Sequence, residues 1–495
     1  EGSHPFYLDR KLGPTPAVAP TVEHPHSEAR SLTGGVVYHG KRYPELAGAY
    51  IYGDHSTGKV WGVRHDGKKI LWHRELVDTP FHITGFAEDS DGEVLILDHA
   101  AKGNMHRLEP NPVESDAAGK FPKLLSQTGL FQSVPGHVLA TGMIPYSVNS
   151  PLWSDGAHKE RAFGIPEGVI DQAALDVSQP RGWTFPDETV IVKSFALEMR
   201  AGDPKSKRWI ETRIMVRQQG EWDGYSYRWN DEQTDAVLVD REGTDAEYTI
   251  QVPRTQDHPQ GRKSQSWHYP SRTECMVCHS RAANFVLGLS TAQMNRDHDY
   301  GKVRDNQLKV LEHLGLLRVN WQADLTTAMR EDLAKKGLKE TEIAEHLAGL
   351  TATRDQRVAP STTLLAVAPD RYPRLANPYD KSQELDRRAR SYLYANCAQC
   401  HVSAGGGNAQ LELDYTVPLE KTKLLETPLH HRFGIEQARV VAPGDPERSV
   451  LLRRVAQRGP GQMPQLATSV VDGAAVAMLE EWIRSLKPSE PGASR

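Results

Sequence analysis

Short apolar runs alternate with polar residues and turn signals through the first part of the chain. One run is Val36–Tyr38, a second is Ala49–Tyr52, and the pair Asp66-Gly67 separates two further runs in the manner of a β-hairpin. Alternation with a period of two is typical of strands that bury one face. The pattern therefore predicts an all-β region over residues 1–112.

The same patterning continues through residues 113–270, where it predicts strands over 189–199, 208–217, 236–239 and 248–252. Aromatic residues are dense in this region, and core packing is the expected role of most of them. The tryptophans are Trp153, Trp183, Trp209, Trp222 and Trp229. A β-rich middle domain is predicted here.

The apolar spacing becomes helical toward the C-terminus. Leu385, Ala389 and Tyr392 share one helical face just before Cys397, and apolar residues repeat in the same way around 450–452 and 476–486. A helix is also expected through 308–317, and the charged segment 320–355 is interpreted as a helical connector. We thus expect a multidomain chain: an all-β N-terminal part, a β-rich middle, a first helical region over 271–370 and a second over 371–495.

Composition narrows the class of protein. The chain has 495 residues, is 38% hydrophobic and 25% charged, and carries a formal charge of −5. These values fit a globular protein of several domains and offer no basic surface for nucleic acid. Its longest apolar runs are too short to be a transmembrane segment.

Every cysteine of the chain belongs to a C-x-x-C-H pentapeptide, the attachment signature of c-type haem. The two thiols bond to the haem vinyl groups, and the adjacent histidine is the proximal iron ligand. A thioredoxin-like redox pair and a zinc knuckle are the alternatives. The pattern predicts two covalent haem c groups held by Cys275, Cys278 and His279 and by Cys397, Cys400 and His401.

Residues 375–488 resemble the class I cytochromes c. The likeness rests on the pentapeptide after a helix, on Met463-Pro464 and on a closing W-I-x-x-L pattern. It implies that Met463 is the distal ligand of the second haem, a role that a soft thioether sulfur suits. At the first haem the distal ligand stays open: Met294 is the first choice, His268 and His298 are alternatives, and a vacant position is also considered.

The N-terminal part is similar to the closing part of the glucose/sorbosone dehydrogenase family, six-bladed β-propellers that use pyrroloquinoline quinone (PQQ). The matching segments are Glu1-Gly2, His24–Ser27, Ser31–Gly35, Tyr43–Leu46 and Phe86–Asp89. The resemblance implies a partial β-propeller whose PQQ and calcium would lie in a missing upstream propeller segment or a partner chain. That segment or partner would complete the propeller.

Residues 115–488 also resemble a family of bacterial dihaem cytochromes, through the loop Asn149–Gly156, an Ile-Glu-Thr-Arg strand and the two pentapeptides. The leading hypothesis is therefore electron transfer from a PQQ-type sugar or alcohol dehydrogenase through both haems to an acceptor protein. A peroxidase-like enzyme with an open first haem, and a haem-containing carbohydrate-binding or assembly protein, are the alternatives. Because c-type haem is attached outside the cytoplasm, we expect a periplasmic or exported protein whose signal peptide is removed or lies upstream.

Overall fold

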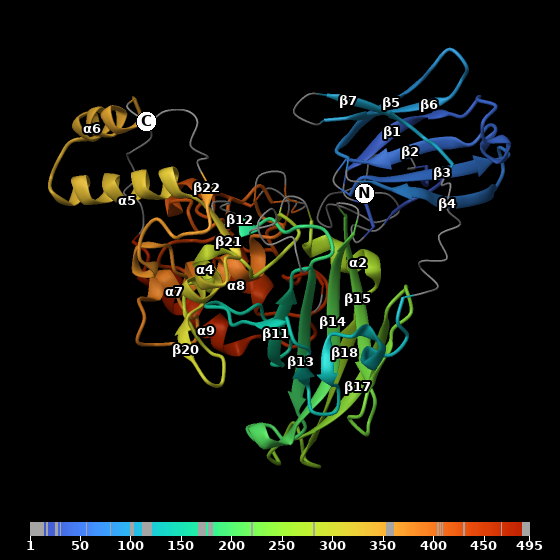
Figure 1. Ribbon diagram of the computed structural model, residues 1–495. Helices are drawn as coiled ribbons and strands as arrows, with labels where there is room; N and C mark the ends of the chain where they lie inside the picture. Colours follow the sequence, from blue (N-terminus) through green and yellow to red (C-terminus); the bar gives the residue numbers. More distant parts are fainter. Residues whose placement is uncertain are drawn as a thin grey trace.

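The fold was analysed in a computed structural model (Figure 1). The structure describes residues 14–487 except for 16–17, 25–27, 30, 56, 80, 100–102, 111–120, 167–174, 177–181, 219–220, 281–282, 353–360, 403–404, 406, 408, 429–430 and 467. The segment Glu1-Gly2 and residues 25–27, on which part of the propeller resemblance rests, lie outside the described residues.

Two antiparallel sheets make up the N-terminal part. The first has four strands and the second has three: β1 (Leu32–Val37), β2 (Tyr50–Asp54), β3 (Lys59–His65) and β4 (Ile70–Asp78); then β5 (Ile83–Glu88), β6 (Val94–Asp98) and β7 (Asn104–Arg107). The expected hairpin at Asp66-Gly67 joins β3 to β4, with Gly67 at φ 91°. Ile51 and Val60 of the first sheet share one core with Ile83 and Ile96 of the second.

The expectation of a propeller architecture was wrong. The described residues of this part form two sheets, and no sheet of the described chain closes into a barrel or propeller. The physical reason lies in the core. Each sheet buries its apolar face against the other, so the apolar alternation is satisfied by a pair of sheets.

The middle of the chain forms a six-stranded antiparallel sheet with the order β10-β11-β13-β14-β15-β16, accompanied by a hairpin of β17 and β18. Its strands are β10 (Ile144–Pro145), β11 (His158–Gly164), β13 (Val190–Glu198), β14 (Lys207–Gln218), β15 (Glu221–Trp229), β16 (Ala236–Leu238), β17 (Thr244–Gln251) and β18 (Arg262–Tyr269). The four strands expected from the sequence are confirmed, the last with shifted ends. Trp183, Trp222 and Trp229 are buried, as expected.

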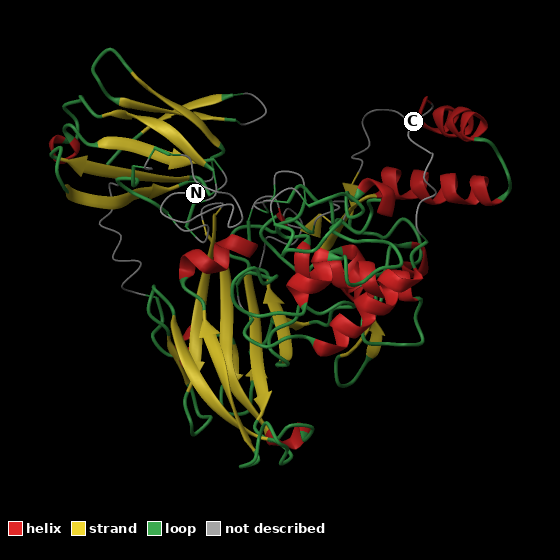
Figure 2. Ribbon diagram, turned by 180° about the vertical axis from the view of Figure 1, so that it is seen from behind, coloured by secondary structure: helices red, strands yellow, loops and turns green. Residues whose placement is uncertain are grey.

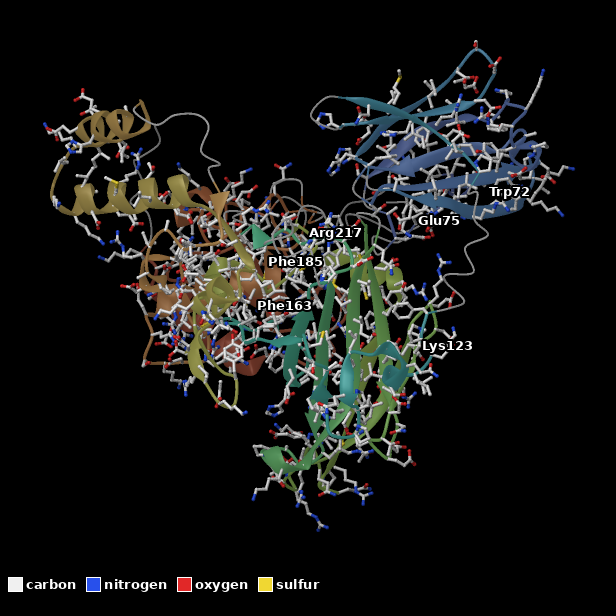
Figure 3. The ribbon with its side chains drawn as sticks, viewed as in Figure 1. Trp72, Glu75, Lys123, Phe163, Phe185 and Arg217 are labelled. Atoms are coloured by element: carbon white, nitrogen blue, oxygen red, sulfur yellow. The ribbon has the colours of Figure 1, made fainter. Side chains whose placement is uncertain are left out.

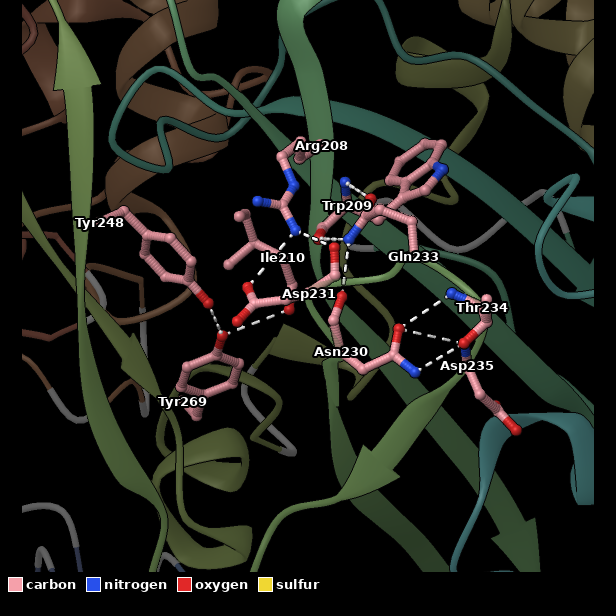
Figure 4. Close-up of polar contacts among 10 residues, drawn as sticks. All are labelled: Arg208, Trp209, Ile210, Asn230, Asp231, Gln233, Thr234, Asp235, Tyr248 and Tyr269. Carbon is pink, nitrogen blue, oxygen red and sulfur yellow. Dashed lines mark hydrogen bonds and ion pairs between the residues drawn. The ribbon is translucent and has the colours of Figure 1, made fainter.

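At one end of this sheet, the side-chain amide of Gln233 forms hydrogen bonds with backbone groups (Figure 4). Gln233 accepts a hydrogen bond from the Trp209 N–H at 2.7 Å and donates to the carbonyl oxygens of Trp209 and Asn230, both at 3.0 Å. The hydroxyls of Tyr248 and Tyr269 are 2.5 Å apart and tie the hairpin together. These contacts satisfy backbone groups where the ladder between β14 and β15 ends.

The described residues contain eight α-helices, most of them short: α2 (Arg272–Cys278), α3 (Thr291–Met294), α4 (Gln307–His313), α5 (Trp321–Lys335), α6 (Glu340–Ala352), α7 (Leu385–Cys397), α8 (Val450–Val455) and α9 (Gly473–Ser485). The remaining strands are β8 (Phe131–Ser133), β9 (Val138–Leu139), β12 (Leu175–Asp176), β19 (Asp297–Asp299), β20 (Arg304–Asn306), β21 (Leu317–Asn320) and β22 (Ser361–Thr362). The expected helix over 308–317 ends at His313, because Gly315 turns the chain at φ 67° and Leu317 begins β21.

The expectation of an α-helical cytochrome c domain at the C-terminus was also wrong. The helices α7, α8 and α9 form where they were expected, but the chain is mostly β-sheet, and an α-helical domain is not what the structure shows. In the described part of residues 398–449 the one helical element is the single 3-10 turn Leu419–Lys421. Frequent glycine and proline explain this, because both interrupt helices. The three helices instead share a core with long loops.

One hydrophobic core joins the large sheet to α3 and α4, and most of the helices lie beside this sheet, away from the N-terminal sheets (Figure 2). Phe163 of β11 and Phe185 belong to this core, together with Leu308 and Leu311 of α4 (Figure 3). Within the described residues we find no helix with the length and apolar character needed to cross a bilayer.

Candidate functional site

The first pentapeptide lies on α2, which begins after the capping residue Ser271. The Ser271 hydroxyl accepts a hydrogen bond from the Glu274 N–H at 3.0 Å, and the Glu274 carboxylate accepts one from the Ser271 N–H at 2.8 Å. This reciprocal cap fixes the start of the helix. Because residues three apart share a helix face, the helix places Cys275 and Cys278 side by side. Burial raises the pKa of the Cys275 thiol to about 11.

His279 ends this helix with its ring orientation fixed. Its Nδ1 is 2.6 Å from the Phe285 carbonyl oxygen, so Nδ1 carries the proton and donates it, which leaves Nε2 as the lone-pair nitrogen. Burial lowers the pKa of His279 to about 4, so the ring is neutral at pH 7. The accepting carbonyl is presented by two successive left-handed residues, Asn284 at φ 52° and Phe285 at φ 57°. Such strained positions concentrate at functional sites.

A cavity of about 180 Å³ opens beside the pentapeptide and is lined by Cys275, Cys278 and His279. Apolar side chains such as Val148, Ile191 and Met215 contribute to its wall. The second pentapeptide region forms another part of the wall, through Tyr394, Ala395, Ala398, Gln399 and Val402. The cavity therefore lies between the two pentapeptides of the chain.

Three cations line the same cavity from adjacent strands of the large sheet. Arg161 on β11 pairs directly with Lys193 on β13, and Lys193 pairs directly with Arg213 on β14. Arg213 is held by the buried carboxylate of Glu211 at 2.8 and 2.9 Å. Burial opposes the charge of Arg213, but the ion pair outweighs it and raises the pKa. We call Arg161, Lys193 and Arg213 the cation row.

At the other two members of the row, Lys193 and Arg161, the cost of burying the charge is offset less well. Burial lowers the pKa of Lys193 well below the ordinary value of a lysine, and burial also lowers the pKa of Arg161. The Lys193 ammonium lies over the Phe195 ring, 5.0 Å from the ring centroid. Charges kept from water are costly unless they are paired. A ligand with negative charge in this cavity would lower that cost.

The second pentapeptide repeats the geometry of the first. It begins at the end of α7, where burial raises the pKa of the Cys397 thiol to about 12. The Nδ1 of His401 donates to the Ala409 carbonyl oxygen at 3.1 Å, and burial lowers the pKa of this histidine. The backbone passes close to this imidazole at Gly407, where a Cβ atom would stand 2.6 Å from His401 Nδ1.

Met463 lies on the loop that joins α8 to α9. Its N–H donates to the Arg454 carbonyl oxygen at 3.0 Å, and the Arg454 guanidinium holds the Gly461 carbonyl oxygen of the same loop at 2.9 Å. The charge of Arg454 is close enough to contribute to the lowered pKa of His401. The loop is thus anchored near His401; a bond from Met463 to the second iron stays a prediction.

The residues predicted as distal ligands of a haem at the first pentapeptide are engaged in other contacts. Met294 is 1% exposed in the main core, and Gln307 Nε2 is 3.8 Å from its sulfur. His268 lines the cavity, but its ring nitrogens bond Asp245 at 2.7 Å and Glu274 at 2.9 Å. Hydrogen bonds to these carboxylates raise its pKa to about 9, which keeps it protonated and without a lone pair. None of these contacts directs a lone pair at the cavity.

His298 is the remaining candidate, and its Nδ1 lies 2.7 Å from the Ser147 hydroxyl. Its ring packs edge-on against Tyr300, with centroids 4.6 Å apart. It does not belong to the described lining of the cavity. The structure therefore brings His279 together with Cys275 and Cys278, but it does not bring Met294 or His298 to them.

The loop Asn149–Gly156 has a role that the sequence did not reveal. The Ser150 hydroxyl donates to the Ser391 carbonyl oxygen on α7 at 2.9 Å, and the Trp153 N–H donates to Asn396 at 2.7 Å. Asp155 accepts bonds from the Ser469 and Val470 N–H groups, both at 2.9 Å. The loop thus clamps the middle domain onto the second pentapeptide region.

The donor set at both pentapeptides fits a covalently attached haem. All four cysteines lie in the described part of the chain and none is in a disulfide. Each motif combines two thiols with a neutral histidine whose Nε2 is the lone-pair nitrogen. Across the described ranges, no three His, Cys, Asp or Glu side chains gather as a chelating group for a metal ion.

Comparisons with known proteins add no family and no fold to these observations. No protein-family model matches it. No solved structure matches its fold either.

Proposed function

We propose that the chain is a dihaem c-type cytochrome that passes electrons from a donor to an external acceptor. One haem would be held by Cys275, Cys278 and His279, and the other by Cys397, Cys400 and His401. The observation that carries the proposal is that the two motif histidines have the same protonation state and the same kind of hydrogen bond. In each motif the histidine is neutral and donates Nδ1–H to a backbone carbonyl six or eight residues later.

A bound haem supplies one-electron chemistry through its iron. The protein's part is to hold and tune the group. The carbonyls of Phe285 and Ala409 fix the tautomer of the two histidines, which leaves the Nε2 lone pair of each available to bind an iron. Apolar burial of the motifs excludes water, and Arg161 and Arg213 would supply positive charge beside a haem at the first pentapeptide.

The shared cavity supports a relay rather than two independent haems. Residues on both sides of Cys397 line the cavity of the first pentapeptide. The loop Asn149–Gly156 forms hydrogen bonds to α7 at Ser391 and Asn396. Two haems held in this way would lie next to each other. From the sequence resemblance we expect the electron donor to be a quinone-dependent sugar or alcohol dehydrogenase, and we expect haem attachment to occur after export.

The proposal is tested by counting haems motif by motif. The chain is produced with the c-type haem attachment machinery, and haem is quantified as the pyridine haemochrome and by mass spectrometry of tryptic peptides. Two haems are expected, one on the peptide with Cys275 and one on the peptide with Cys397. Alanine variants of each cysteine pair are the matched controls, and each should lose one haem and keep the other.

The relay itself is tested by reduction. With a quinone-dependent dehydrogenase and its sugar as donor, both haems should be reduced, and the rate should fall when either cysteine pair is replaced. A wild-type chain with fewer than two haems contradicts the proposal. So does a two-haem chain that neither the enzymatic donor nor a small-molecule reductant reduces.

A further inference from the structure

The cation row crosses the wall of the cavity in a fixed order. Arg213, Lys193 and Arg161 are direct cross-strand partners on β14, β13 and β11, so their side chains leave the same face of the sheet. Neighbouring strands are about 4.8 Å apart, so the row extends over about 10 Å. All three residues line the cavity.

Arg213 is the member of the row that lies nearest to Cys275 and Cys278. Gly224 on β15 lies opposite Met215 on β14, and Cys275 packs directly onto Gly224. Arg213 is also close enough to Cys275 and Cys278 to interact electrostatically with both. The row therefore starts beside the two cysteines and runs away from them toward Arg161.

A c-type haem is tied to its cysteines by the vinyl edge. Its propionates are at the opposite edge, and its iron is between the two edges. Along the row, Arg213 is beside the cysteines, Lys193 is one strand further and Arg161 is two strands further. The order matches the vinyl edge, the iron and the propionate edge of an attached haem.

Only the middle member of the row can bind iron. A guanidinium stays protonated and has no lone pair, whereas a lysine amine that loses its proton has one. Arg213 is also committed to Glu211. Among the described residues the Lys193 ammonium has no ion-pair partner, and its charge reaches His279. Lys193 therefore occupies the cavity near the proximal histidine.

We propose that Lys193 is the second axial ligand of the first haem, with His279 as the first, and that Arg161 faces the haem propionates. This rests on the proposed function. On binding, the Lys193 ammonium releases its proton to solvent and its nitrogen lone pair forms the bond to iron; nothing is oxidised or reduced. The assignment explains why Met294, His268 and His298 are all engaged elsewhere.

The test uses the two-haem protein and three variants. Lys193→Ala removes the amine, and Lys193→Arg keeps the positive charge but cannot bind iron. Lys207→Ala removes an exposed lysine from the neighbouring strand β14 and is the matched control. Spin state is measured by electron paramagnetic resonance and near-infrared magnetic circular dichroism. Carbon monoxide binding is measured on the reduced protein.

Wild type and Lys207→Ala should keep two low-spin haems and bind no carbon monoxide. Both Lys193 variants should lose half of the low-spin signal and bind one carbon monoxide per chain, and methylamine should restore the low-spin signal of Lys193→Ala. Haem is counted in parallel, so that loss of an axial ligand can be distinguished from loss of the haem itself. The inference is overturned if Lys193→Ala and Lys193→Arg keep two low-spin haems, or if the wild-type first haem is open. A wild-type chain lacking haem overturns the proposed function itself.

Discussion

Cys275 packs onto a residue without a side chain: a Cβ atom at Gly224 would stand 2.8 Å from Cys275 Cβ and 3.0 Å from its sulfur. Gly224 is on β15 and Cys275 is on α2, so the missing side chain sets how closely the motif helix approaches the large sheet. This closeness also brings the cysteines to the Arg213 end of the cation row.

Gly224→Ala should disturb the first haem and spare the second. The added methyl group would force α2 away from β15, and overpacking of this kind costs about 1–3 kcal/mol. We expect the peptide with Cys275 to carry less haem, while the peptide with Cys397 keeps a full complement. Gly473→Ala is the matched control, because nothing lies within 4 Å of the Cβ position there. Equal loss at both motifs would contradict the local role of Gly224.

Gly407→Ala should have the reciprocal effect. A Cβ atom at this position would stand 2.6 Å from His401 Nδ1 and 2.9 Å from the Cys400 carbonyl oxygen. The imidazole would have to move, and its 3.1 Å bond to Ala409 would be lost. We expect the second haem to show a changed midpoint potential or incomplete attachment. A potentiometric titration that shifts only the first haem would disprove this assignment.

The parts of the fold that follow from local pattern were predictable. The alternation around Lys193 gave the right strand, and the apolar face before Cys397 gave the right helix. The propeller and the α-helical cytochrome domain were wrong because both depend on how elements pack. Alternation specifies a buried face but not its partner, and the likeness of 375–488 to helical cytochromes did not account for the glycines and prolines between Cys400 and Val450.

The candidate site was predictable only in part. The pentapeptides are contiguous, so Cys275, Cys278 and His279 could be assigned from sequence. The cation row could not, because its members are brought together by the register of β11, β13 and β14. A signal was nevertheless present: Lys193, followed by Ser194, interrupts the apolar run Val190–Leu197. A charge within a buried strand calls for a partner or a ligand.

The protein should lose stability at alkaline pH, because His268 then loses the proton on which its two ion pairs depend. Its pKa is raised to about 9 by hydrogen bonds to Glu274 and Asp245, above the ordinary 6.5. A raised pKa in the folded state contributes stability that is complete below pH 6.5 and is lost as the pH rises through 9. Because the side chain is 36% exposed, solvent screening limits the contribution to about 1 kcal/mol.

Urea unfolding of His268→Asn between pH 6 and 10 measures this contribution. The variant should be less stable than wild type at pH 6, and the difference should vanish near pH 10. His346→Asn, at an exposed position of α6, should follow wild type throughout. A His268→Asn deficit that stays constant over the whole range would show that the ion pairs are not its source.

Asp155 should be the strongest single contact between the middle domain and the second pentapeptide region. Its carboxylate accepts hydrogen bonds from the Thr468 hydroxyl at 2.7 Å and from the Ser469 and Val470 N–H groups, both at 2.9 Å. In Asp155→Ala these donors lose their acceptor. These donors are exposed or only partly buried, so water can replace part of what is lost, and we expect a loss of about 1 kcal/mol. Since Met463 is on the same loop, the second haem should also bind carbon monoxide more readily.

Asp155→Asn keeps one oxygen and should fall between Asp155→Ala and wild type, whereas Asp257→Ala, on an exposed turn, should resemble wild type. Urea unfolding gives the stability of each variant, and carbon monoxide titration of the reduced protein gives the accessibility of each haem. A stable Asp155→Ala variant with unchanged carbon monoxide binding would mean that the loop is held by its other contacts. Chief among these is the 2.8 Å bond from Trp153 Nε1 to the Val470 carbonyl oxygen.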